Sequence, residues 1–159
     1  MYGVPSEYYL TYKGKALLGQ SKRLDKIKVE QIAHDIAVLD AVIYFVLKEG
    51  VPLSDILSEK QLHGLDGFGS RKHRPDFVFS REGRKFCVEV ELSAKSKERF
   101  QQNMKQNFDD YEVQNWVVPK AQVKIMELLE QNLSTYPNIE IIFLEEVEEY
   151  VRNYRKSEF

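Results

Sequence analysis

The chain has 159 residues, 43% of them hydrophobic and 30% charged, which is typical of one soluble globular domain. A formal net charge of −2 excludes a surface that is basic throughout, so any contact with nucleic acid must come from local basic clusters. No apolar run approaches the roughly 20 residues of a membrane helix, and no signal-peptide pattern is visible. With one cysteine, Cys87, there is no internal disulfide, so we expect a cytoplasmic protein without membrane association.

The first part of the chain does not have enough apolar residues for a core of its own. The stretch YYLTYKGKALLG, residues 8–19, is typical of a short strand followed by a short helix. We expect residues 1–24 to be the end of a preceding segment or a strap, and residues 25–159 to form the main domain. A long helix is predicted over 26–48 by apolar residues at helical spacing, and Gly50 and Pro52 end it.

The next three elements are expected to be strands. SDILSEKQL, residues 54–62, is compatible with a helix or a strand, and the glycine-rich loop and hairpin that come after it favour an edge strand. Residues 76–80 and 85–92 are rich in Phe and Val, and the turn between them contains Gly83, which can adopt a positive φ.

Helices and strands alternate over the rest of the chain. A helix over 95–110 is predicted to bury Phe100, Met104, Phe108 and Tyr111, and one over 120–133 to bury Val123, Met126, Leu129 and Leu133; strands are predicted at 113–118 and 138–144, and the acidic tail is expected to be helical. The order αβββαβαβα predicts an α/β (α+β) fold with a mixed central sheet and helices on both faces.

Three carboxylates stand out in the hairpin. Side chains alternate along a strand, so Cys87, Glu89 and Glu91 share the face opposite to the hydrophobic side chains of residues 86–92. A tight turn at Gly83 would place Asp76 opposite Glu89, with Cβ atoms roughly 4.5–5.5 Å apart. Opposed like charges destabilise a sheet, so we expect neighbouring cations or a divalent metal ion to balance them.

The following helix adds cations to this picture. Lys95, Lys97 and Arg99 are predicted in its first turns, where the helix dipole disfavours positive charge. Their placement is reasonable if an anion such as a phosphate binds at this helix start. Carboxylates for a metal beside cations for a phosphate indicate cleavage of a phosphodiester.

At these residues the sequence resembles the PD-(D/E)xK nuclease superfamily. Pro75-Asp76 and Glu89 match its motif, and Glu91 occupies the position of the usual lysine. Some members of that superfamily take the lysine from the following helix, which would be Lys95 here. The resemblance implies a restriction-endonuclease-like fold. It also implies Mg²⁺ or Mn²⁺ held by Asp76, Glu89 and the Val90 carbonyl, with Glu91 and Lys95 completing the catalytic set.

A narrower likeness is to the replication-relaxation family of plasmids and integrative elements. RPD at 74–76, EVELS at 89–93 and Lys95-Ser96 match its pattern, and His34 lies in a helix similar to one upstream of that pattern. Residues 7–19 look like the end of the winged helix of that family. The resemblance implies a relaxase-like protein that nicks plasmid or mobile-element DNA.

These observations give a set of candidate residues and leave other functions open. The residues expected to contact the DNA backbone are His73, Arg74, Lys97 and Arg99, and His34, Glu59 and Ser93 are further candidates for the site. One alternative is a catalytically inactive, DNA-binding accessory protein of plasmid replication, transfer or regulation. Another is a protein-interaction domain in which a salt-bridged cluster holds the carboxylates. The sequence leaves open whether the protein is a homodimer.

Overall fold

The computed structural model describes residues 29–66 and 72–157. Contacts divide the chain into two units, residues 1–32 and 33–159. Of the first unit only residues 29–32 are described, as the beginning of a helix, and the sheet and the remaining helices belong to the second unit. The strand and helix expected at 8–19, the proposed boundary after residue 24 and the start of the helix at 26 all lie outside the described residues.

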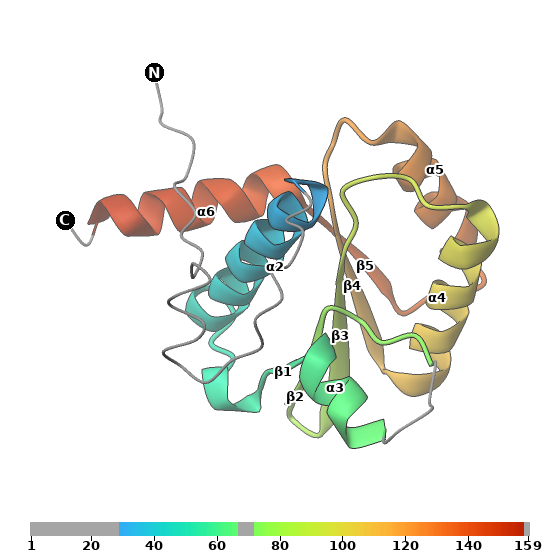
Figure 1. Ribbon diagram of the computed structural model, residues 1–159, viewed down its shortest axis with the longest axis horizontal. Coiled ribbons are helices and arrows are strands. Elements are labelled where there is room, and N and C mark those ends of the chain that lie inside the picture. Colours follow the sequence, from blue (N-terminus) through green and yellow to red (C-terminus); the bar gives the residue numbers. More distant parts are fainter. Residues whose placement is uncertain (1–28, 67–71, 158–159) are drawn as a thin grey trace, which may run out of the picture. The chain divides into compact units, whose positions relative to one another are not determined.

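One open sheet of five strands organises the described part of the chain (Figure 1). Its strand order is β1-β2-β3-β4-β5, in which β1, β2 and β3 are antiparallel and β3, β4 and β5 are parallel. The predicted α/β fold with a mixed sheet is therefore confirmed. The elements are α2 (Val29–Leu47), a 3₁₀ turn η1 (Leu53–Asp55), β1 (Leu57–Ser58), α3 (Glu59–Asp66), β2 (Phe77–Arg81), β3 (Arg84–Val90), α4 (Lys97–Asp110), β4 (Val113–Val118), α5 (Val123–Asn132), β5 (Ile139–Phe143) and α6 (Leu144–Ser157).

The segment 54–62 differs from the edge strand that we expected. Only Leu57 and Ser58 pair with β2, and the chain turns directly into helix α3. Ser58 stabilises this transition, because its main-chain N–H and its hydroxyl both donate to Oε1 of Gln61, at 2.9 and 2.7 Å. The element order therefore contains one helix that the sequence did not predict, α3, which lies between β1 and β2.

The hairpin of β2 and β3 has the predicted register. Gly83 has φ +76° and Glu82 has φ +53°, so both central residues of the turn have the positive φ of a type I′ turn. Phe79 pairs with Phe86, and the pairing continues as far as Phe77 and Val88. It ends one residue short of Asp76 and Glu89, which places Asp76 just outside the strand.

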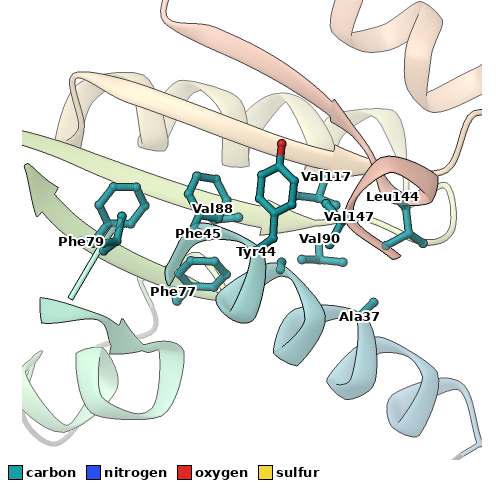
Figure 2. Close-up of a cluster of buried hydrophobic side chains, with 12 residues drawn as sticks. Ala37, Tyr44, Phe45, Phe77, Phe79, Val88, Val90, Val117, Leu144 and Val147 are labelled. Carbon is teal, nitrogen blue, oxygen red and sulfur yellow. The ribbon is translucent and has the colours of Figure 1, made fainter. Parts of the chain in front are cut away.

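Helices cover both faces of the sheet, as predicted. α2 and α6 pack on one face, where Phe77, Phe79, Val88 and Val90 form the floor of a core cluster (Figure 2). α4 and α5 pack on the other face around the fully buried Trp116. Cys87 is buried on that second face with Leu62 of α3, so the alternation read from residues 86–92 is confirmed.

Three details of the helices differ from the sequence expectations. Lys95 lies before α4 and not in its first turn, because Ser96 is the N-cap and its hydroxyl accepts from the Arg99 N–H at 3.3 Å. Val123 and Leu133 are exposed, because α5 is shorter than predicted; it buries Leu129, as predicted, together with Ile125, which was not predicted. Phe108 is also exposed, at 40%, because α4 turns a different stripe toward the sheet.

Candidate functional site

The three carboxylates meet where β2 begins and β3 ends. Asp76 directly precedes β2, Glu89 lies next to the last residue of β3, and Glu91 follows the strand. Glu91 stays attached to the sheet, since its N–H donates to the Val117 carbonyl of β4 at 3.0 Å. Glu89 and Asp76 both help to raise the pKa of Glu91, so each of them lies within electrostatic reach of Glu91.

Asp76 bridges the sheet and the helix above it. Its Oδ2 accepts a hydrogen bond from the Val90 N–H at 2.7 Å, which takes the place of a strand partner beyond the end of β2. Its Oδ1 lies 3.4 Å from Nε2 of His34 in α2. The main-chain carbonyl of Asp76 accepts a hydrogen bond from the Glu59 N–H at 2.9 Å. Glu59, one of the further candidates, is therefore linked to the site by its main chain.

His34, predicted as a further candidate, lies within the site. Its Nε2 is 3.0 Å from the Val90 carbonyl oxygen as well as 3.4 Å from Asp76. The hydrogen bond to the Asp76 carboxylate raises the pKa of His34 to about 9, against the opposing effect of burial. At neutral pH the ring is therefore an imidazolium that donates to two oxygens at once.

Glu89 is deeply enclosed, with 4% of its surface exposed. Its Oε1 is 2.5 Å from Nε2 of His73 and accepts from Nδ2 of Asn107 in α4 at 2.9 Å. Both donors converge on the same oxygen, and no donor of the described residues is seen at Oε2. Buried carboxylates are stable only with such partners, so Glu89 is held in its place from two sides.

Glu91 and Lys95 form an ion pair four residues apart, with Oε2 and Nζ at 2.7 Å. Burial raises the pKa of Glu91, and Lys95 acts in the opposite direction. Lys95 thus reaches back to Glu91 from the connection that follows β3. Ser93, the last of the further candidates, is exposed in the same connection.

Most of the predicted DNA contacts line one groove. The groove has a volume of about 520 Å³ and lies between α3 and α4; His73, Arg74 and Arg99 line it, together with Glu59, His63 and Lys72. Arg74 forms a bidentate ion pair with Asp66 at the end of α3, and His73 contacts Glu89. Arg99 and Lys97, both exposed at the start of α4, have no ion-pair partner among the described residues.

Asn107 and Lys72 belong to this region and were missed from the sequence. The buried residues of α4 are Phe100, Asn103, Met104 and Asn107, which follow the helical spacing i, i+3, i+4 and i+7. The two asparagines on that stripe were the available signal, because a polar side chain on a buried face needs a partner. Lys72 lies 2.7 Å from Asp110, and its signal in the sequence was the basic run RKHR at 71–74.

The expected Mg²⁺ or Mn²⁺ would need ligand oxygens that are arranged around one point. Among residues 29–66 and 72–157, no group of three or more His, Cys, Asp or Glu side chains is arranged as a ready metal site. Two of the expected ligand oxygens, on Asp76 and Val90, do converge, and they converge on Nε2 of His34. In this geometry both oxygens face the His34 ring, so a metal ion could take this place only after His34 had left it.

Comparison of the chain with protein-family models, with curated proteins and with solved structures finds no match. The fold and the geometry of the site therefore carry the functional argument by themselves. No helix in the described part of the chain is long and apolar enough to cross a membrane.

Proposed function

We propose that the chain is a metal-dependent DNA-nicking or endonuclease domain, of the kind found in replication-relaxation proteins of plasmids and mobile elements. The observation that carries the proposal is the meeting of Asp76, Glu89 and Glu91 at one end of the sheet, with Lys95 paired to Glu91. Carboxylates beside a lysine are the groups that a phosphodiesterase needs, and the groove with Arg99 opens next to them.

In this proposal Asp76, the Glu89 carboxylate and the Val90 carbonyl would hold Mg²⁺ or Mn²⁺. When bound, the ion polarises the phosphoryl group and activates a water molecule. His34 gives up its contacts to Asp76 and Val90, and it stays close enough to hold a proton beside them. Lys95 turns from Glu91 to the scissile phosphate, while Arg99 and Lys97 bind the neighbouring phosphates.

Mn²⁺ titration of the purified chain tests the metal site directly. We expect the wild type to bind Mn²⁺ and to be thermally stabilised by it, and Asp76→Ala and Glu89→Ala to lose both effects while staying folded. Glu127→Ala, at an exposed carboxylate of α5, is the matched control and retains both effects. Nicking of a supercoiled plasmid in Mn²⁺ is measured on the same variants, and undiminished nicking by both site variants would refute the proposal.

A second candidate function is a catalytically inactive DNA-binding accessory protein. It is favoured by one specific observation: each carboxylate is already paired with a group of the protein. Asp76 contacts His34, Glu89 contacts His73 and Asn107, and Glu91 contacts Lys95. Such internal pairing is what a site that has exchanged its metal for protein donors would show. This candidate predicts DNA binding that is independent of Mn²⁺ and unchanged in Asp76→Ala.

A further inference from the structure

A cavity of about 410 Å³ lies on the face of the sheet that α2 and α6 cover. It lies near the hairpin turn and the first residues of β5, whereas the carboxylates of the candidate site lie at the other end of β3. This volume is typical of sites for small molecules. The lining includes none of the residues proposed for DNA cleavage, so a ligand bound here would be independent of that function.

Aromatic side chains form much of the wall of this cavity. Tyr44 and Phe45 come from the last turn of α2, and Phe79 comes from β2 (Figure 2). Phe86 of β3 stacks on Phe79, with 4.9 Å between the ring centroids and 6° between the ring planes. Two arginines and three glutamates also line the cavity, so it has no strong charge of either sign. Such a lining favours a flat, uncharged ring, which gains dispersion and stacking contacts.

Asn115 of β4 brings an unpaired acceptor to the cavity. Only 3% of this residue is exposed, and its register partners on the two sides are Val88 and Glu140. Its Nδ2 donates to the main-chain carbonyl of Cys87 at 3.4 Å, and turning the amide over would place two oxygens in contact. No donor of the described residues is seen at Oδ1, and this oxygen is not sealed in the core, so it is reached from the cavity.

The packing of the strand does not explain an asparagine at this position. Val117, two residues later, lies on the same face of β4 and is fully buried in the core. Asparagine is depleted in strands, and an enclosed amide oxygen without a donor costs free energy. A ligand that donates to Oδ1 of Asn115 removes this cost, which gives the amide a purpose.

Glu140 places a second acceptor beside Asn115. The two residues are register partners on neighbouring parallel strands, which lie about 4.7–4.9 Å apart, so their side chains stand next to each other on one face. Glu140 is exposed, and no hydrogen bond or ion pair of its carboxylate is seen among the described residues. An amide oxygen next to a carboxylate matches a partner that carries adjacent N–H donors.

We propose that this cavity binds a guanine base. Guanine is the common nucleobase whose Watson–Crick edge has two adjacent donors, N1–H and the 2-amino group, whereas the other bases have one donor beside acceptors. Oδ1 of Asn115 and the Glu140 carboxylate accept from this edge, and the ring packs against the aromatic wall. Free guanine nucleotides and unpaired guanines of a strand offer the same edge, so the test compares the two sources.

NMR titration of the isotope-labelled chain with guanosine monophosphate (GMP) tests the site. We expect GMP to shift the side-chain amide signals of Asn115 and the main-chain amide signals of Phe86 and Glu140. Inosine monophosphate, which lacks the 2-amino donor, and adenosine monophosphate should bind about tenfold more weakly. A thymidine pentamer with one central guanine is titrated on the same signals; tighter binding than GMP identifies a strand as the source, and weaker binding a free nucleotide. Unshifted signals at all three residues, or equal binding of the three nucleotides, would overturn the proposal.

Glu140→Gln, with Glu148→Gln as the matched control, tests the carboxylate. Both glutamates are exposed, so each substitution removes one negative charge without changing the core, and of the two only Glu140 lines the cavity. The GMP dissociation constant should rise about tenfold in Glu140→Gln, because the new amide replaces one acceptor by a donor, and should stay unchanged in Glu148→Gln. An equal constant in the wild type and Glu140→Gln contradicts the assignment.

Asn115→Thr tests the enclosed acceptor, since threonine has nearly the same volume and suits a strand. We expect the same tenfold loss of GMP affinity, and Glu140→Gln decides the question alone if Asn115→Thr does not fold. N-acetylarginine amide, added in place of GMP, probes whether the acceptors hold an arginine of a partner protein instead. Stronger shifts at Asn115 and Glu140 with this compound than with GMP would show a protein as the occupant and refute the guanine assignment.

Discussion

Nε2 of His34, in the second turn of α2, lies 3.4 Å from Oδ1 of Asp76, the residue directly before β2. The two residues are far apart in the sequence, and their contact ties a helix on one face of the sheet to the end of the hairpin. The same nitrogen lies 3.0 Å from the carbonyl oxygen of Val90, so one charged ring stabilises two oxygens. Protonation of a single residue thus affects both the fold and the candidate site.

The first prediction is a dependence of stability on pH through His34. The pKa of this ring is about 9 in the folded chain, against the ordinary value of 6.5 that applies to the unfolded chain. Because the folded state binds the proton more tightly, the contribution is fully present below pH 6.5 and is lost as the pH rises through about 9. Urea unfolding of the wild type and His34→Gln should show a wide gap in free energy at pH 6 that closes by about pH 10. A gap that does not change with pH would contradict this assignment.

The parts of the fold that the sequence predicted correctly rest on local rules. The hairpin register followed from Gly83 and from the matching of Phe79 with Phe86, since a shift by one residue would have moved every phenylalanine to the wrong face. Strand β4 was predicted with its observed bounds, Val113–Val118. The segment 54–62 was predicted less well, because a strand of two residues followed by a helix has no period long enough to be read.

The sequence identified most residues of the candidate site, but it did not predict most of the contacts between them. Asp76, Glu89 and Glu91 were found from side-chain alternation and the register of the hairpin, and Lys95 from the resemblance to the nuclease superfamily. That Asp76 leaves the strand and binds the Val90 N–H depends on where the pairing ends, which is a tertiary effect. The pairing of Arg74 with Asp66 could not be foreseen either, because it required helix α3 at a place where a strand was expected.

The second prediction concerns the turn of the hairpin. Glu82 has a φ of +53°, a conformation that costs energy for a side chain other than Gly, Asn or Asp. Glu82→Asn creates the Asn-Gly pair that type I′ turns favour, so we expect the variant to be more stable by about 0.5–1 kcal/mol. Urea unfolding measures the difference, and Glu82→Val, which is β-branched, should lower the stability. An unchanged midpoint in both variants would show that this backbone conformation carries no strain.

The third prediction concerns the ion pair of Lys95 with Glu91. Lys95→Met removes the ammonium group, so the pKa of the buried Glu91 carboxyl should rise further above its usual range. The variant should lose about 1–3 kcal/mol of stability at neutral pH, where a buried charge is left without its partner. The loss should shrink as the pH falls through the pKa of Glu91, since the protonated group needs no cation. Carbon-detected NMR titration follows Glu91 itself, and Lys97→Met, at an exposed lysine two residues later, should change neither quantity.

The fourth prediction concerns the groove between α3 and α4. Arg99 lines it and has no ion-pair partner in the described part of the chain, so it is free to bind a phosphate without breaking an internal contact. Arg99→Ala should weaken DNA binding for all sequences alike and make the slope of log K against log salt shallower by about one. Fluorescence anisotropy of a labelled oligonucleotide at several salt concentrations measures both effects. Lys124→Ala, at an exposed lysine of α5 outside the groove, removes the same charge and should leave the slope as it is in the wild type. Equal effects of the two substitutions would mean that DNA responds only to overall charge, and the groove would then not be its binding site.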